Sequence, residues 1–153
     1  MHLAHYLGLL HRSQNDLADA FRAVRLGHPR EPDLYGVCER LAAQCRDQAR
    51  RLEPFLRRYG PSAPDEPERM HGTLFSGARR GALGLLRDLH DLYLLATECE
   101  VSWALIGHAA KGARDEELLD LVRHCGQETA VHLLWLRSRM RQAAPQALVV
   151  RAW

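Results

Sequence analysis

The spacing of the apolar residues constrains the fold more than any other feature of this sequence. In four long segments these residues recur at alternating steps of three and four, a pattern that fits one face of an α-helix and excludes a β-strand. The segments cover about residues 3–26, 33–59, 79–111 and 115–143, and the last is expected to end before Pro145. We therefore expect an all-α protein with no sheet.

The connections between the segments predict how the helices are arranged. Residues 27–32 read GHPREP, and their glycine and two prolines end one helix and open the next. A short turn near Gly112 leads to Asp115, an expected N-cap. Residues 60–78 are rich in Pro, Gly, Ser and acids and break the periodicity. One domain, residues 1–153, is expected to hold two antiparallel hairpins joined by this crossover.

The charge and the hydropathy of the chain indicate which cellular environment and which partners to expect. The chain has 21 basic (Lys and Arg) and 19 acidic residues, a formal net charge of +2, and the two signs are interleaved, so nucleic acid is not an expected partner. No apolar run approaches the roughly 20 residues of a membrane helix. The start MHLAHYLGLLHRS lacks a basic leader and a small-residue cleavage site. We expect a soluble cytoplasmic protein.

The cysteines predict free thiols. Cys38, Cys45, Cys99 and Cys125 contain no close C-x-x-C pair of the kind that binds zinc. A cytoplasmic protein keeps its thiols reduced, so disulfides are not expected. Cys99 and Cys125 fall at nearby levels on neighbouring helices, which leaves thiol redox chemistry as one interpretation of this pair.

Several polar residues fall on or beside the apolar faces of the expected helices at one level. When each hairpin is folded about its turn, Gln14 lies opposite Cys45 and Gln48, and Glu100 lies opposite Glu128. His132 follows Glu128 by four residues and shares its helix face. A buried carboxylate is unfavourable unless it is paired, hydrogen-bonded, protonated or bound to a metal. This layer is therefore the candidate site.

The arrangement resembles the ferritin-like superfamily, whose di-iron members carry one Glu on each of two helices and Glu-x-x-His on each of the other two. At the corresponding places this chain has the neutral amide of Gln14 and the sequence CRDQ at 45–48. Glu100 and Glu128 match the pattern, and the histidine, His132, comes one residue late. The resemblance implies a degenerate site, and an intact di-iron centre is not expected.

Three interpretations of the layer stay open. In the first, Gln14, Glu100, Glu128 and His132 hydrogen-bond to one another and fix the helix register. In the second, Glu100, Glu128 and His132 hold one transition-metal or zinc ion. Further ligands would then come from the set Cys45, Cys125, Gln14 and Gln48. The third is the thiol chemistry of the Cys99 and Cys125 pair.

The function expected from these features is that of a non-catalytic binding or scaffold protein that kept the ferritin-like bundle and lost the iron chemistry. The alternative is a metal-binding oxidoreductase or metal-handling protein that uses Glu100, Glu128 and His132. We also expect self-association, as a dimer, and a protein partner. For the apolar C-terminal segment APQALVVRAW three hypotheses stay open: it packs back on the bundle, contacts a second subunit, or serves as a docking tail.

Overall fold

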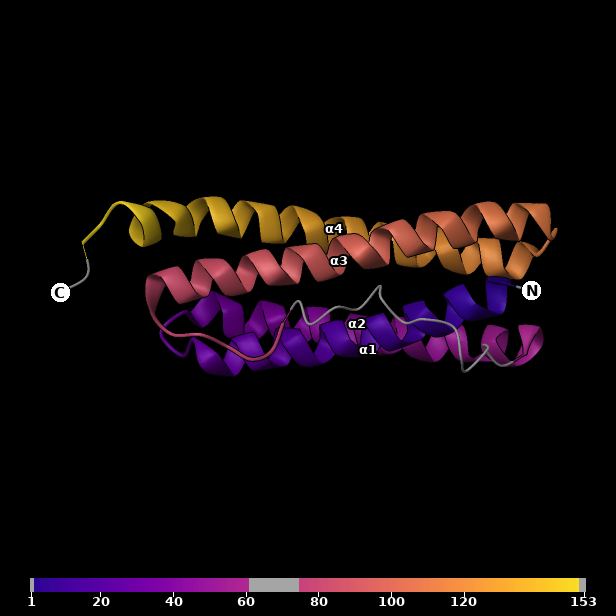
Figure 1. The fold of residues 1–153 in the computed structure, drawn as a ribbon, viewed down its shortest axis with the longest axis horizontal. Helices are drawn as coiled ribbons and strands as arrows, with labels where there is room; N and C mark the ends of the chain where they lie inside the picture. The colour runs from indigo at the N-terminus through magenta and orange to yellow at the C-terminus, as the bar shows by residue number, and fades with distance from the viewer. Residues whose placement is uncertain (1, 61–74, 152–153) are drawn as a thin grey trace.

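The computed structural model describes residues 2–60 and 75–151, which form four long helices (Figure 1). Their bounds are His2–Gly27 for α1, Pro32–Tyr59 for α2, Gly81–Gly112 for α3 and Glu116–Leu148 for α4. No strand occurs in these two ranges. The predicted all-α four-helix bundle is confirmed, whereas most of the expected crossover, residues 61–74, lies outside the described residues.

The two predicted hairpins are also present. Helices α1 and α2 pack together, as do α3 and α4, each pair across a short turn. Arg58 at the end of α2 pairs with Asp115 before α4, and Arg139 late in α4 pairs with Asp33 at the start of α2. Helices α2 and α4 are therefore antiparallel, which makes α2 and α3 parallel. Figure 1 shows that α2 ends and α3 begins at opposite ends of the bundle.

Local chemistry explains most of the helix ends. Asp115 caps α4 as predicted, since its Oδ1 accepts a hydrogen bond from the backbone N–H of Leu118 at 3.0 Å. Gly60 follows α2 with φ 86°, a backbone conformation that favours glycine. The predicted end of α4 before Pro145 is wrong, because the helix continues to Leu148. Near a helix end a proline removes only one backbone bond, and the N–H of Val149 closes the turn on the Pro145 carbonyl at 3.0 Å.

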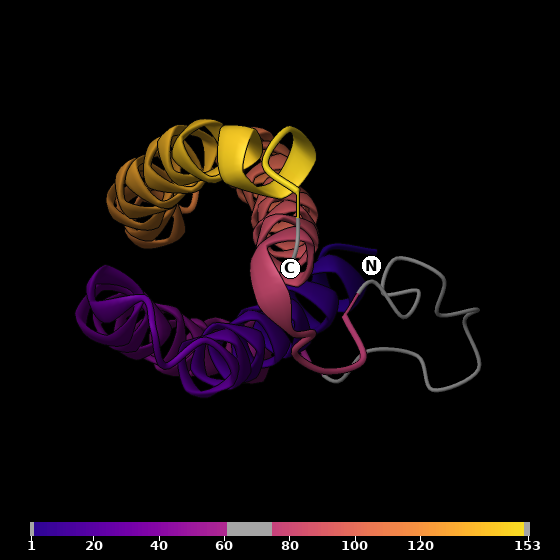
Figure 2. The ribbon, with the colours of Figure 1, turned by 90° about the vertical axis from the view of Figure 1, so that its left-hand side faces the viewer.

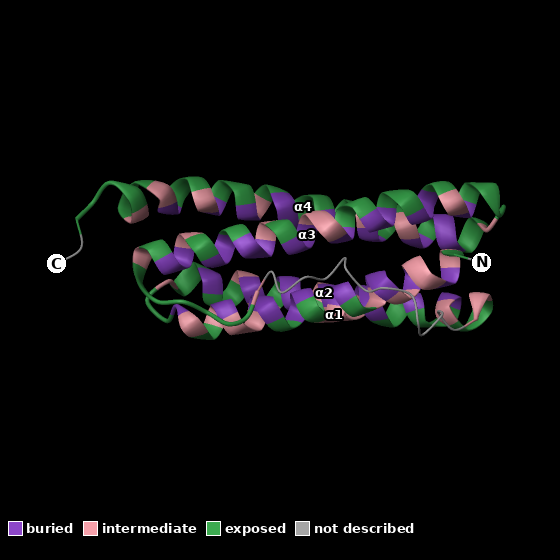
Figure 3. Ribbon diagram, in the orientation of Figure 1, coloured by how far each residue is buried: buried purple, intermediate pink, exposed green. Residues whose placement is uncertain are grey.

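The core is continuous along the bundle and lies between the four helices. The inward faces of all four carry the buried residues, whereas their outer faces are exposed (Figure 3). Trp103 and Phe21 are the largest side chains that are completely buried. Among the described residues no helix combines the length and the apolar character needed to cross a membrane.

The four helices do not pack symmetrically. Seen along the bundle they form an arc, with α1 and α3 in the middle and α2 and α4 at its two ends (Figure 2). Helices α1 and α3 approach each other at more places than α2 and α4 do. The side of the bundle between α2 and α4 is consequently bridged by long side chains, and these carry the candidate site.

Candidate polar layer in the core

Gln48 is the centre of a polar layer halfway along the bundle. Its side chain is completely buried on α2. The amide oxygen of Gln48 accepts a hydrogen bond from the indole N–H of Trp103 on α3 at 3.2 Å. The amide nitrogen donates to Oε1 of Glu128 on α4 at 3.1 Å. One glutamine therefore links three helices, and it uses both ends of its amide to do so.

His132 forms the next contact between α4 and α2. Its Nε2 lies 2.7 Å from Oε1 of Gln44, an acceptor, so Nε2 carries the proton and Nδ1 is the acceptor. The ring is 1% exposed and packs edge-on against Phe21 of α1, with the centroids 6.1 Å apart. Burial lowers the pKa of His132 to about 4. The imidazole is therefore neutral at pH 7.

Two side chains in this part of the core keep hydrogen-bonding capacity that nothing uses. Both amide atoms of Gln14 are buried without a partner in the structure, and so is Nδ1 of His132. Asn15, next to Gln14, accepts a hydrogen bond from Arg46 of α2 at 2.8 Å, which places Gln14 level with residues 46–48. The predicted level of Gln14, Cys45 and Gln48 is thus reproduced. Leaving such groups unpaired in the core is unfavourable by about 1–3 kcal/mol each.

The predicted inward position of Glu100 is wrong. Glu100 is exposed on α3, whereas Cys99 is completely buried. The inward face of α3 passes from Ala96 through Cys99 to Trp103, in steps of three and four. A shift of one residue turns a side chain by about 100° around a helix, which removes Glu100 from the core. Of the three predicted metal ligands, Glu128 and His132 contact α2 and Glu100 does not join them.

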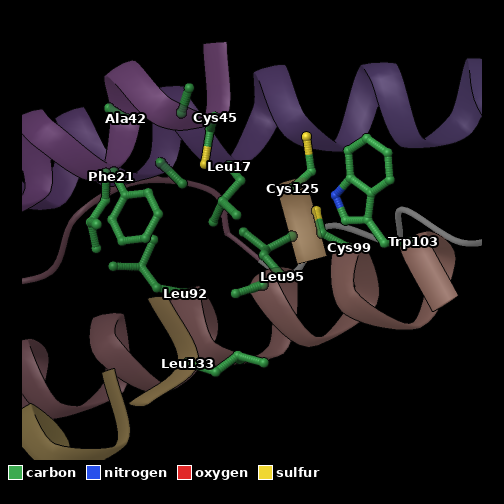
Figure 4. Close-up of a cluster of buried hydrophobic side chains, with 14 of the residues drawn as sticks. Leu17, Phe21, Ala42, Cys45, Leu92, Leu95, Cys99, Trp103, Cys125 and Leu133 are labelled. Atoms are coloured by element: carbon green, nitrogen blue, oxygen red, sulfur yellow. The ribbon is translucent and has the colours of Figure 1, made fainter. Parts of the chain in front are cut away.

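Three of the thiols lie close to this layer and are buried. Figure 4 shows Cys45, Cys99 and Cys125 within the buried cluster that contains Trp103. All four cysteines of the chain are free and buried. Burial raises the pKa of Cys125 to about 12, and it also raises the pKa of Cys45 and of Cys99. Because the thiolate is the nucleophile, a raised pKa makes these thiols weak nucleophiles at neutral pH.

No group of three or more His, Cys, Asp or Glu side chains is arranged to hold a metal ion in residues 2–60 and 75–151. Nε2 of His124 lies 3.7 Å from Oε1 of Glu128, and the same oxygen accepts a hydrogen bond from the amide of Gln48. Glu128 is also 22% exposed at its side chain. The layer that the structure assembles is therefore an amide, indole and imidazole network that reaches solvent at Glu128.

Two residues of the layer, and one polar pair outside it, were not predicted from the sequence. Gln44 and Trp103 supply hydrogen bonds to the layer, and His28 pairs with Asp88 at the end of the bundle. The position of Asp88 offered a signal, because it falls three residues after Leu85 on the inward face of α3. No comparable signal in the sequence pointed to Gln44. This residue lies at the edge of the inward face of α2, where polar residues are common.

Comparison of the chain with protein-family models, with curated proteins and with solved structures finds no match.

Proposed function

We propose that this protein is a ferritin-like bundle without iron chemistry that binds a small, uncharged polar molecule in its central layer. The observation that carries the proposal is the unused hydrogen-bonding capacity of Gln14 and His132. Buried polar groups are normally hydrogen-bonded, so unpaired ones indicate a missing partner. The amide of Gln14 offers a donor and an acceptor, and Nδ1 of His132 offers a second acceptor.

The charge of the layer favours an uncharged ligand. Gln14 and Gln48 are neutral amides, and the low pKa of His132 keeps its ring uncharged. In the ferritin-like family the corresponding places hold carboxylates that balance the charge of two metal ions. A cation in this layer would meet only the carboxylate of Glu128, which Gln48 already engages. This is the reason for proposing a binding protein and not a metal enzyme.

The α2–α4 side offers the route into the layer. Here the helices make few close contacts, and the bridging side chains, Gln44 and Glu128, are partly exposed. Long side chains change rotamer without disturbing the backbone, so a small molecule enters between them more readily than between α1 and α3. Self-association, a protein partner and a cytoplasmic location stay predictions of the sequence.

Mass spectrometry tests the proposal on protein purified without added metal. Native spectra of the wild type are expected to show a small molecule retained on the chain, and Gln14→Leu is expected to lose it. Elemental analysis of the same sample is expected to find no stoichiometric metal. A stoichiometric metal that disappears in Glu128→Ala but persists in the exposed control Glu100→Ala would overturn the proposal, as would a wild-type chain that retains nothing.

A further inference from the structure

A cavity of about 620 Å³ opens at the end of the bundle where α1 turns into α2 and where α3 begins. It lies away from the polar layer and shares no residue with it. Its wall includes His28, Arg30 and Glu31 from the turn, Arg80 and Gly81 at the start of α3, and Leu85 one turn further on. Cavities of about 300–1,000 Å³ accommodate small organic molecules.

A buried network fixes one wall of this cavity. Asp88 is completely buried on α3, and its Oδ2 lies 2.7 Å from Nε2 of His28. The same carboxylate accepts two hydrogen bonds from Arg79, from the backbone N–H at 2.9 Å and from the guanidinium at 2.8 Å. Arg79 also donates to Asp91 at 2.9 Å. Arg79 thus bridges the two carboxylates, and the contact with Asp88 holds the His28 ring in place.

Close backbone packing fixes the segment that leads into α3. A Cβ atom on Gly27 would stand 2.3 Å from the Cβ of Ala78, and one on Gly84 would stand 2.9 Å from the Cβ of Arg79. The two glycines therefore let residues 78–79 lie directly on α1 and α3. Because Arg79 is bound to Asp88 and Asp91, the next residue, Arg80, is held at the cavity wall.

The residues that line the cavity include two arginines, Arg30 and Arg80, and one carboxylate, Glu31. Neither Arg30 nor Arg80 forms an ion pair with any carboxylate in the part of the chain that the structure describes. Glu31 is also in the wall, but it pairs with Arg139 at 2.8 Å. The first turn of α3 has no side-chain cap, so its backbone N–H groups add further donors at Gly81. Two guanidinium groups without an ion-pair partner in the wall, against one carboxylate that is already paired, favour an anion.

We propose that this cavity binds a phosphorylated small molecule. Arg30 and Arg80 bind the phosphoryl oxygens, because the guanidinium fork matches phosphate geometry. The volume is much larger than a phosphoryl group needs, and the apolar wall at Leu85 receives the organic part. The site lies apart from the central layer, so it does not depend on the ligand proposed there.

Calorimetric titration with inorganic pyrophosphate tests this site in the full chain. The wild type is expected to bind saturably at low salt. Arg30→Gln and Arg80→Gln are each expected to weaken binding about tenfold or more, since each removes charge-assisted hydrogen bonds. Arg87→Gln is the matched control, because Arg87 is exposed on the same helix as the cavity wall but does not line the cavity. It is expected to change the affinity by less than about twofold.

Two results would overturn the proposal. One is the absence of saturable heat with pyrophosphate up to about 10 mM, a concentration that would reveal even weak sites. The other is a loss of affinity in Arg87→Gln as large as that in Arg80→Gln, which would indicate a diffuse charge effect. Gln14→Leu is expected to bind pyrophosphate like the wild type, so failure of this site and failure of the central layer are separable.

Discussion

The two sides of the bundle are held together in different ways. Between α1 and α3 the helices approach closely, and the buried residues of both are mostly apolar. Between α2 and α4 few residues approach, and long polar side chains bridge the helices. Gln48 reaches Glu128, Gln44 reaches His132, and Arg139 reaches Asp33 at 2.7 Å. We call the α1–α3 side the packed side, because apolar contacts hold it together. We call the α2–α4 side the linked side, because polar side chains bridge it.

The difference predicts which side contributes more to stability. Apolar packing contributes most of the folding free energy, whereas exposed ion pairs contribute about 0–1 kcal/mol each. The α1–α3 side should therefore hold the bundle together even when the α2–α4 side is disturbed. The ligand proposed above would enter from the linked side, because Gln44 and Glu128 are partly exposed there. Four measurements probe this contrast, in order of decreasing expected effect.

Truncating the packed side should have the largest effect. Phe21 on α1 is completely buried, so Phe21→Ala is expected to lower the free energy of unfolding by about 3–5 kcal/mol through lost burial and the cavity left behind. Chemical denaturation measures this value. The control Val131→Ala removes a residue that is 59% exposed on α4, and it should change stability by less than about 0.5 kcal/mol. If Phe21→Ala lowered the free energy of unfolding by less than about 1.5 kcal/mol, Phe21 would not lie in a closely packed core.

Acid should weaken the linked side through His132. Its pKa falls from 6.5 in the unfolded chain to about 4 in the fold, because burial disfavours the charged ring. Between pH 4 and 6.5 the imidazole is protonated in the unfolded chain but not in the folded one. Protonation therefore favours the unfolded state, and the free energy of unfolding decreases as the pH falls from about 6.5 to 4. The loss amounts to about 3 kcal/mol.

Denaturation at several pH values measures this dependence. His132→Gln should show a shallower fall in stability over the same range, and the difference between the two chains isolates His132 from the other histidines. Equal slopes for the wild type and His132→Gln would contradict the neutral, buried state of this ring.

Adding a side chain where the end of α1 contacts the segment before α3 should have an intermediate effect on stability. Gly27→Ala places a methyl group against Ala78, and the required backbone shift is expected to cost about 1–3 kcal/mol. Gly36→Ala is the matched control, since Gly36 lies in α2 with nothing near its missing Cβ. That control should be neutral or stabilising by up to about 1 kcal/mol, because alanine is the better helix former. Thermal unfolding distinguishes them, and similar melting temperatures would argue against the close approach.

Removing an unpaired polar group should give the smallest change, with the opposite sign. Gln14→Leu replaces a buried amide without partners by an apolar side chain of similar size. Ligand-free protein is expected to gain about 1 kcal/mol of stability, because the desolvation penalty disappears. Chemical denaturation of ligand-free wild type and variant measures the gain. A clear destabilisation would mean that the amide already has a partner.

Periodicity and turn chemistry predicted the architecture well. The four helices, the two hairpins, the Asp115 cap and the end of α2 at Gly60 all depend on local sequence, and the structure contains each of them. The level shared by Gln14 and Gln48 also followed from folding the hairpins about their turns. The end of α4 was misjudged because a proline near a helix terminus interrupts it less than one in the middle.

The orientation of single polar side chains was harder to predict. Glu100 and Cys99 are adjacent, and the apolar pattern of α3 is broad enough to admit either on its inward face. The choice between them depends on how α3 is rotated against α1 and α4, which is a property of the whole core. The same limit explains why the pairing of Asp88 with His28, 60 residues apart, was not foreseen.

The sequence by itself determined the helices and their order, because helix periodicity and turn chemistry are local properties. Only the tertiary structure decided which polar groups are buried, which of them lack partners, and which side of the bundle is packed. These depend on the rotation and separation of helices that are distant in sequence. A rotation by one residue decides whether a carboxylate faces the core or the solvent.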